Sequence, residues 1–296
     1  MKKIIESLMK NIEKPETPQE IDLIIDGGGF KAAYIVGNLL YLKEMEKQGF
    51  ITIARISGTS MGSLLGVLYF LDKLNIVYKL LPVFSKDYKK TNKLTNTFSF
   101  IKRSLNAIIR EKGMSNIDKR LYINYYDLEN NREVLINTYS TSENLFKKLH
   151  FSCFIPFMFD GRPSICNKID GITPFIFPKR ENVKILFLSA VSISNISTFS
   201  EVLYTDDKNI TYKMLQGILD MHAFYLDNKS TNMSHYIDKN SLTTTVYFLI
   251  RKILTYFIVM LIHLYGIIQG KTDISHYYVI AKKVFESVKH TLNSSI

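Results

Sequence analysis

The chain has 296 residues and a formal net charge of +11. Its content of 46% hydrophobic and 12% aromatic residues is typical of a globular protein and excludes a largely disordered chain. The two cysteines, Cys153 and Cys166, form no Cys-x-x-Cys or Cys/His cluster, so neither a zinc site nor a disulfide framework is expected. The positive charge predicts an anionic partner, either nucleic acid or an acidic membrane surface, and does not choose between them.

Residues 1–19 are expected to form an arm ahead of the main domain. Apolar residues from Ile4 to Ile12 fall at helical spacing, which predicts a short amphipathic helix before the Pro15–Pro18 linker. This helix is expected either to pack on the domain or to lie on a membrane. Charged residues interrupt the segment before an apolar signal core can form, so no secretory signal is expected and the predicted location is intracellular.

A glycine-rich loop follows the first predicted strand, residues 21–25. Gly27, Gly28 and Gly29 separate this strand from a helix-like segment that ends near Gly49. Consecutive glycines bring bare backbone N–H groups to the N-terminus of a helix, where an anion or a developing oxyanion is stabilised. The loop therefore predicts a site for negative charge.

The same loop also fits the dinucleotide-binding pattern G-x-G-x-x-G/A through Gly27, Gly29 and Ala32. That interpretation requires an acidic residue at the end of the second strand, about 20 residues further on, to bind the ribose. The second predicted strand instead ends in Ile56-Ser57-Gly58. Dinucleotide binding is therefore disfavoured.

The second predicted strand, residues 51–57, runs into the sequence GTSMG at 58–62, and a helix is predicted for 63–71. Strand, Gly-x-Ser-x-Gly turn and helix together describe a nucleophile elbow. Such a turn holds the serine in a strained backbone conformation and exposes its hydroxyl at the end of the strand. Ser60 is the candidate nucleophile.

The next segments predict helices at 74–90, 99–111 and 117–127, a strand at 133–139 and a helix at 142–150. A short strand at 165–169 then leads into Asp170-Gly171, in a turn closed by Pro174. By itself an Asp-Gly pair predicts only a turn.

Taken together, the three motifs make the chain resemble the patatin-like phospholipases. That family carries a DGGGx(R/K)G loop, a GxSxG elbow and, more than a hundred residues later, a DG(G/A) motif, which correspond here to DGGGFKA at 26–32, GTSMG at 58–62 and DGI at 170–172. The chain departs from the pattern at Ala32, where the family has glycine, and at Ile172, where it has glycine or alanine. The bulkier Ile172 is expected to affect the width of the substrate that the site accepts and the rate of the reaction.

The resemblance implies an α/β fold, a three-layer α/β/α sandwich with a mostly parallel central sheet. It implies a catalytic dyad in which Ser60 is the nucleophile and Asp170 the general base, with no metal and no cofactor. Desolvation would raise the pKa of such an aspartate far enough for it to hold and return a proton. The remaining implied site residues are Gly27, Gly28, Gly29 and Lys31 of the oxyanion loop and Gly58, Gly62 and Gly171 of the elbow and turn.

The expected function is that of a lipid acyl hydrolase that cleaves esters of phospholipids or related lipids at a membrane surface, without a nucleic-acid partner. One alternative is a catalytically weak patatin-like fold that serves as a membrane-binding module. Another is a Ser-Asp-His α/β-hydrolase that uses a histidine after Asp170. The candidates for that role are His222, His235, His263, His276 and His290, none of which lies in a loop of the expected kind.

Beyond a predicted strand at 183–189 and a helix at 212–226, residues 227–242 are the best linker candidate. The expected domains are therefore a catalytic domain at 20–226 and a C-terminal helical extension at 227–296. Within the extension, the uninterrupted apolar part of Val246–Ile268 has 16 residues, short of the ~20 that span a bilayer. A buried helix, an interfacial helix and a membrane span all remain open. Residues 275–292 predict a closing amphipathic helix, and no oligomeric state is predicted.

Overall fold

The computed structural model describes residues 1–91, 93–190, 209–237 and 242–269. Seven strands form one sheet in the order β4-β3-β2-β1-β6-β7, and β5 pairs with β3 outside this path. Their bounds are β1 (Gln19–Ile25), β2 (Ile51–Gly58), β3 (Leu121–Asp127), β4 (Arg132–Ile136), β5 (Lys168–Asp170), β6 (Lys184–Leu188) and β7 (Ser234–Tyr236). The four central strands, β3, β2, β1 and β6, are parallel, whereas β4, β5 and β7 pair antiparallel.

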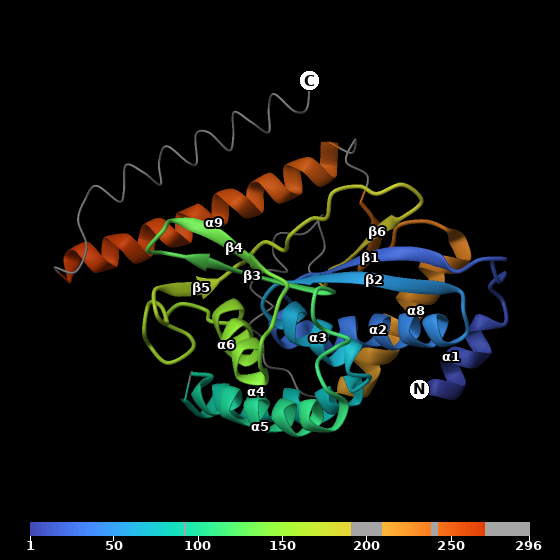
Figure 1. Ribbon diagram of the computed structural model, residues 1–296, viewed down its shortest axis with the longest axis horizontal. Coiled ribbons are helices and arrows are strands. Elements are labelled where there is room, and N and C mark those ends of the chain that lie inside the picture. The colour runs from blue at the N-terminus through green and yellow to red at the C-terminus, as the bar shows by residue number, and fades with distance from the viewer. Residues whose placement is uncertain (92, 191–208, 238–241, 270–296) are drawn as a thin grey trace.

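Helices cover both faces of the sheet (Figure 1). Most of them lie on one face: α1 (Lys2–Met9), α2 (Ala32–Lys47), α3 (Met61–Phe70), α4 (Val77–Thr91), α5 (Thr95–Lys112), α6 (Ser142–Ser152) and α8 (Ile210–Asp227), with the short turns η1 (Gly29–Lys31) and η2 (Leu74–Ile76). The other face carries α9 (Leu242–Ile268). The expected three-layer α/β/α sandwich with a mostly parallel sheet is therefore confirmed.

Alternation along β1 explains the two layers of packing. Leu23 and Ile25 belong to the large core with α2, α3 and α8, whereas Ile24 lies in a smaller cluster on the opposite face. Successive side chains of a strand point to opposite faces, so a strand buried on both sides must be apolar throughout. The predicted N-terminal helix also joins the large core, because Ile5 and Met9 of α1 are buried there.

Two expectations from the sequence are wrong. Residues 117–127, expected to be helical, contain the central strand β3, because isoleucine and tyrosine favour a pleated sheet and β3 lies between β2 and β4. Residues 227–242, expected to be a linker, contain β7, which pairs with β6 at Phe187 and His235. The predicted helix at 275–292 lies outside the described residues.

Helix α9 has two unlike sides. Tyr256, Val259 and Ile262 are buried against the sheet with Tyr126 and Ile169. On its outer side, apolar residues at intervals of three or four form a stripe, and each is between 38% and 79% exposed: Val246, Ile250, Ile253, Phe257, Leu261, Leu264, Tyr265 and Ile268. Such spacing defines one continuous helix face.

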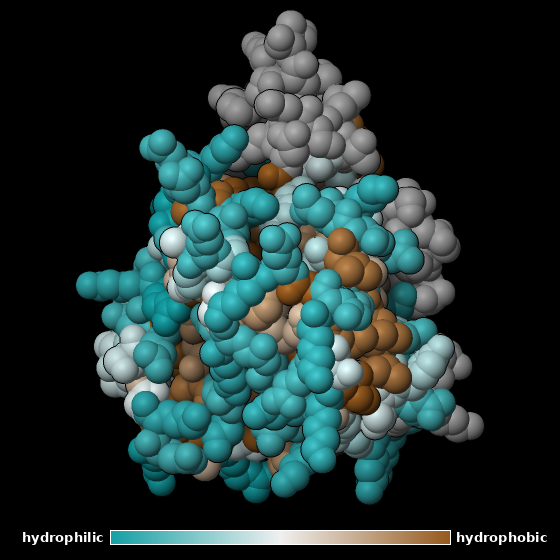
Figure 2. Space-filling view, turned by 90° about the vertical axis from the view of Figure 1, so that its right-hand side faces the viewer, coloured by the Kyte–Doolittle hydropathy of each residue, from teal (hydrophilic) through white to brown (hydrophobic). Residues whose placement is uncertain are grey.

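One end of the molecule has a more polar surface than the stripe on α9. The face seen in Figure 2 is largely hydrophilic, with hydrophobic side chains confined to smaller patches. By length and composition, the segment Thr244–Ile268 could cross a membrane, although the core helix of a soluble protein can pass the same test.

Candidate active site

Ser60 occupies a sharp turn between β2 and α3. Its backbone has φ of 52° and ψ of −129°, a conformation that non-glycine residues rarely adopt and that is common where a chain holds a functional side chain in place. The turn requires glycine on either side. A Cβ atom on Gly62 would lie 2.2 Å from the carbonyl oxygen of Ile25, and one on Gly58 would lie 2.6 Å from the backbone of Gly62.

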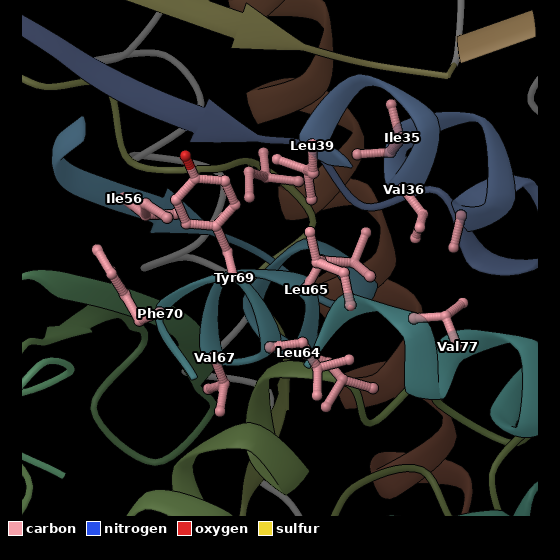
Figure 3. Packing of buried hydrophobic residues seen from close by; sticks show 14 of the residues in the cluster. Ile35, Val36, Leu39, Ile56, Leu64, Leu65, Val67, Tyr69, Phe70 and Val77 are labelled. Carbon is pink, nitrogen blue, oxygen red and sulfur yellow. The ribbon is translucent and has the colours of Figure 1, made fainter. Parts of the chain in front are cut away.

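Helix α3 anchors the turn in the large core. Leu64, Leu65 and Val67 are buried, and Figure 3 shows them among apolar side chains from α2, including Leu39. A helix that is apolar on all sides must be buried in the interior. Ser60 is therefore held at the end of a rigid element.

The register of β3 explains how Ser60 meets a residue far away in the sequence. Parallel strand β2 ends at Gly58, opposite Ile123 of β3, and antiparallel strand β5 ends at Asp170, opposite Tyr125. These two positions on β3 are two residues apart, so the two strand ends face one another across roughly 7 Å. The hydroxyl of Ser60 accordingly lies in hydrogen-bonding reach of the Asp170 carboxylate.

Asp170 is a buried carboxyl group with a perturbed pKa. Burial raises the pKa of Asp170 from 3.8 to about 6, while hydrogen bonds from Ser60 and from the Ile172 N–H act in the opposite direction. The N–H of Ile172 donates to Oδ1 of Asp170 over 2.9 Å. A carboxyl group with a pKa near neutrality can both take up and release a proton at physiological pH.

The turn after Asp170 is tight and strained. A Cβ on Gly171 would lie 2.6 Å from Nδ2 of Asn124 on β3, so only glycine fits at that position. Ile172 follows with φ of +59°. This left-handed conformation is unfavourable for a β-branched residue and persists only where the surroundings impose it.

The glycine-rich loop lies directly against the elbow. A Cβ on Gly27 would approach the Cβ of Ser60 to 3.1 Å. Gly29 has φ of +48°, and the N–H of Lys31 donates to the carbonyl of Gly28 over 2.8 Å, which closes η1. Within the described residues, the N–H groups of Gly28 and Gly29 make no backbone hydrogen bond outside the helices and strands.

Three supporting residues were not singled out from the sequence. Ser152 accepts a hydrogen bond from the N–H of Ser60 over 3.0 Å, and Ser189 donates to Oδ2 of Asp26 over 2.8 Å. Arg251 of α9 pairs with the same Asp26. Its only signal in the sequence is that it interrupts an otherwise apolar run.

The described histidines that follow Asp170 contact side chains other than Ser60 and Asp170. Nδ1 of His222 bonds the hydroxyl of Tyr41, and Nε2 of His263 bonds Oδ1 of Asn131. His235 packs edge-on against Phe187. His276 and His290 lie outside the described residues. Also within the described chain, no group of three or more His, Cys, Asp or Glu residues could hold a metal ion.

Comparison with protein families matches residues 23–173 to the patatin-like phospholipase model. The chain belongs to the patatin-like phospholipase family. The matched segment contains the glycine-rich loop, the elbow at Ser60 and the Asp170-Gly171 turn. Members of this family are lipid hydrolases and acyltransferases.

Two individual proteins are similar to the chain. Human omega-hydroxyceramide transacylase is 22% identical over 148 residues, which cover 48% of this chain and 27% of that protein. A chain in the crystal structure of full-length SpcU in complex with full-length ExoU, from the type III secretion system of Pseudomonas aeruginosa, is 14% identical with a TM-score of 0.34. That match covers 82% of this chain and 61% of the other.

Proposed function

We propose that the protein is a lipid acyl hydrolase that works through a Ser60–Asp170 dyad. The observation that carries this proposal is the contact between the Ser60 hydroxyl, on a strained turn at a helix N-terminus, and a buried carboxyl group whose pKa is about 6. A nucleophile within reach of a base is the signature of covalent catalysis. Membership of the patatin-like phospholipase family supports a lipid ester as the substrate class.

In the proposed first half-reaction, Oγ of Ser60 attacks the carbonyl carbon of a lipid ester while its proton passes to Asp170. The N–H groups of Gly28 and Gly29 donate to the oxyanion that develops on the carbonyl oxygen. A donor of this kind contributes about 3 kcal/mol to the transition state in comparable sites. The ester C–O bond then breaks, and Asp170 returns the proton to the departing alcohol.

In the second half-reaction, Asp170 takes a proton from water as the water oxygen attacks the acyl-Ser60 ester. The Ser60–acyl bond breaks, Ser60 regains its proton and the fatty acid leaves. A lipid hydroxyl in place of water would give transacylation by the same steps. The glycines that flank the nucleophile, Gly58 and Gly62, keep its turn sharp, Gly171 shapes the turn at the base, and Lys31 orders the oxyanion loop.

We further propose that the outer stripe of α9, defined above from Val246 to Ile268, lies on a lipid bilayer. A long-chain ester leaves its bilayer reluctantly, so the enzyme must reach the substrate at the interface. Apolar side chains of the stripe would enter the headgroup region, and this contribution resists salt. The net charge of +11 adds attraction to anionic lipids that salt weakens.

Covalent labelling by a fluorophosphonate tests the dyad. The wild-type protein is expected to be labelled at Ser60 and to hydrolyse a lipid ester, whereas Ser60→Ala is expected to lose both activities. Asp170→Asn is expected to lose turnover while keeping its fold, as judged by circular dichroism. Activity that survives in either variant would remove the dyad, and loss of activity in His222→Ala or His235→Ala with the fold intact would instead support a Ser-Asp-His triad.

A catalytically weak membrane-binding module is the second candidate, and it rests on a specific observation. Ile172, beside the proposed base, adopts a left-handed conformation that is costly for its residue type. A protein that binds anionic liposomes but neither reacts with the fluorophosphonate nor hydrolyses lipid esters would be that module.

A further inference from the structure

Arg251 extends from α9 to both loops of the proposed site. Its Nη1 donates to Oδ2 of Asp26, at the start of the glycine-rich loop, over 2.5 Å. Its Nη2 donates to the carbonyl oxygen of Ile172, in the turn after Asp170, also over 2.5 Å. The hydroxyl of Tyr247 accepts a further bond from Nη1 over 2.9 Å. One planar guanidinium thus bridges two segments that are about 145 residues apart in the sequence.

The ion pair between Asp26 and Arg251 is buried, so the loss of either partner is expected to be costly. The side chain of Asp26 is fully buried and that of Arg251 is 12% exposed. A buried charge pair with good geometry costs little when intact but leaves an uncompensated charge when one partner is lost. Asp26 therefore holds Arg251 in place, and Arg251 in turn reaches Ile172.

Hydrogen bonds fix both the N–H and the carbonyl group of Ile172. Its N–H donates to Oδ1 of Asp170, and its carbonyl accepts from Arg251. These bonds oppose the tendency of a β-branched residue to leave the left-handed region. Glycine would adopt that conformation without strain and would need less support. The residue type at position 172 and the arginine on α9 are thus linked by one geometric requirement.

We propose that Arg251 is a positioning residue that fixes the Asp170 turn against the glycine-rich loop, so that the active site is complete only when α9 is docked. The proposal rests on the proposed function, since it assigns Asp170 and Gly27–Gly29 their catalytic roles. Arg251 touches no reacting atom in this scheme. It acts through the carbonyl of Ile172 and the carboxylate of Asp26.

Charges around Asp170 give the proposal a second readout. Arg251 lowers the pKa of Asp170, whereas Asp26 raises it. Among the described residues, the other titratable groups that face this cluster are Cys153 beside Asp170 and, beside Asp26, Tyr247 and His235. Removal of Arg251 should therefore raise the pKa of the base, and removal of the negative charge of Asp26 should lower it.

The test compares Arg251→Lys and Arg251→Gln with Lys252→Gln, which removes one positive charge from the neighbouring position of the same helix. A soluble short-chain ester serves as substrate, so that membrane binding does not enter. Both Arg251 variants are expected to lose about 100-fold in kcat, the size of effect that a misplacement of about 1 Å produces. Lysine lacks the planar guanidinium that donates to Asp26 and Ile172 at the same time. Lys252→Gln is expected to keep the wild-type kcat.

The pH profile and a second background separate positioning from simple loss of stability. Arg251→Gln should move the acid limb of kcat/KM to higher pH and Asp26→Asn should move it to lower pH, whereas a purely structural defect moves neither. In an Ile172→Gly background, the factor by which Arg251→Lys lowers kcat should shrink towards one. The same factor in both backgrounds would contradict the proposed link through Ile172.

Hydrogen exchange tests whether Arg251 holds the turn without relying on enzyme activity. Exchange at residues 170–173 is expected to rise in Arg251→Lys and to stay at the wild-type level in Lys252→Gln. Unchanged exchange, kcat and pH profile in Arg251→Lys would overturn the inference even though the wild type hydrolyses esters. A wild type that neither labels at Ser60 nor hydrolyses esters would instead refute the proposed function, and exchange would still report whether Arg251 holds the turn.

Discussion

Replacing Asp170 with asparagine is expected to abolish hydrolysis and to stabilise the folded protein above pH 6. Asp170 is buried, and its pKa is raised from 3.8 to about 6. At about 1.4 kcal/mol per pH unit, keeping this group ionised costs the folded state about 3 kcal/mol. Asparagine has nearly the same shape, carries no charge, and keeps a carbonyl oxygen that can accept the N–H of Ile172.

The pH dependence follows from the direction of the shift. Because the folded-state pKa lies above the unfolded one, Asp170 contributes no penalty below about pH 3, where it is protonated in both states. The penalty grows as pH rises and is complete once pH exceeds the folded-state pKa of about 6. The gain in unfolding free energy for Asp170→Asn should therefore approach about 3 kcal/mol at pH 8 and fall to about 1 kcal/mol at pH 4.5.

Urea unfolding at pH 8 and pH 4.5, with ester hydrolysis at pH 8, measures both effects. Asp127→Asn provides a matched control on the neighbouring strand. Burial alone would raise the pKa of Asp127, but hydrogen bonds from Lys168 and Asn130 hold it below its usual value, so this control should be destabilised at pH 8. An Asp170→Asn protein that is less stable than wild type at pH 8, or that still turns over, would refute the reasoning.

Gly27→Ala should slow fluorophosphonate labelling by about 10-fold or more, because the new Cβ meets the Cβ of Ser60 at 3.1 Å and displaces the nucleophile; an unchanged labelling rate would remove Gly27 from the site. Hydrolysis should persist in excess EDTA, and a requirement for millimolar calcium would mean that the dyad mechanism is wrong. Phe257→Asp together with Leu261→Asp, both on the outer face of α9, should abolish co-sedimentation with anionic liposomes at high salt while leaving hydrolysis of a soluble ester intact. Binding that survives in this double variant would exclude the stripe as the lipid contact.

The family and the fold class could be predicted because the motifs are local. The sequence GTSMG lies between an apolar strand and an apolar helix, and a turn of that kind is determined within about fifteen residues. Likewise, continuous apolar runs such as residues 21–25 predict strands covered on both faces. The catalytic roles of Ser60 and Asp170 remain predictions, although the structure brings the two side chains together.

Features that depend on contacts between distant segments could not be predicted from local sequence patterns. Local spacing predicts a helix at residues 117–127, but the position of β3 between β2 and β4 decides the conformation of Leu121–Asp127. Nothing near Arg251 in the sequence indicates that its partner is Asp26, because the contact depends on how α9 crosses the sheet. Similarly, the positive φ of Ile172 arises from the turn that Gly171 and Asn124 impose.

The two sides of α9 constrain how the helix can meet a membrane. Its outer stripe is apolar and exposed, whereas its inner side carries Arg251 in a buried pair with Asp26, together with His263 bonded to Asn131. Full insertion would move an arginine into hydrocarbon at a cost of several kcal/mol and would leave Asp26 buried without its partner. A helix that lies flat satisfies both sides at once, since the stripe faces lipid while Arg251 stays on the site. Under this arrangement membrane contact and an assembled active site are compatible, and membrane insertion of α9 and catalysis exclude one another.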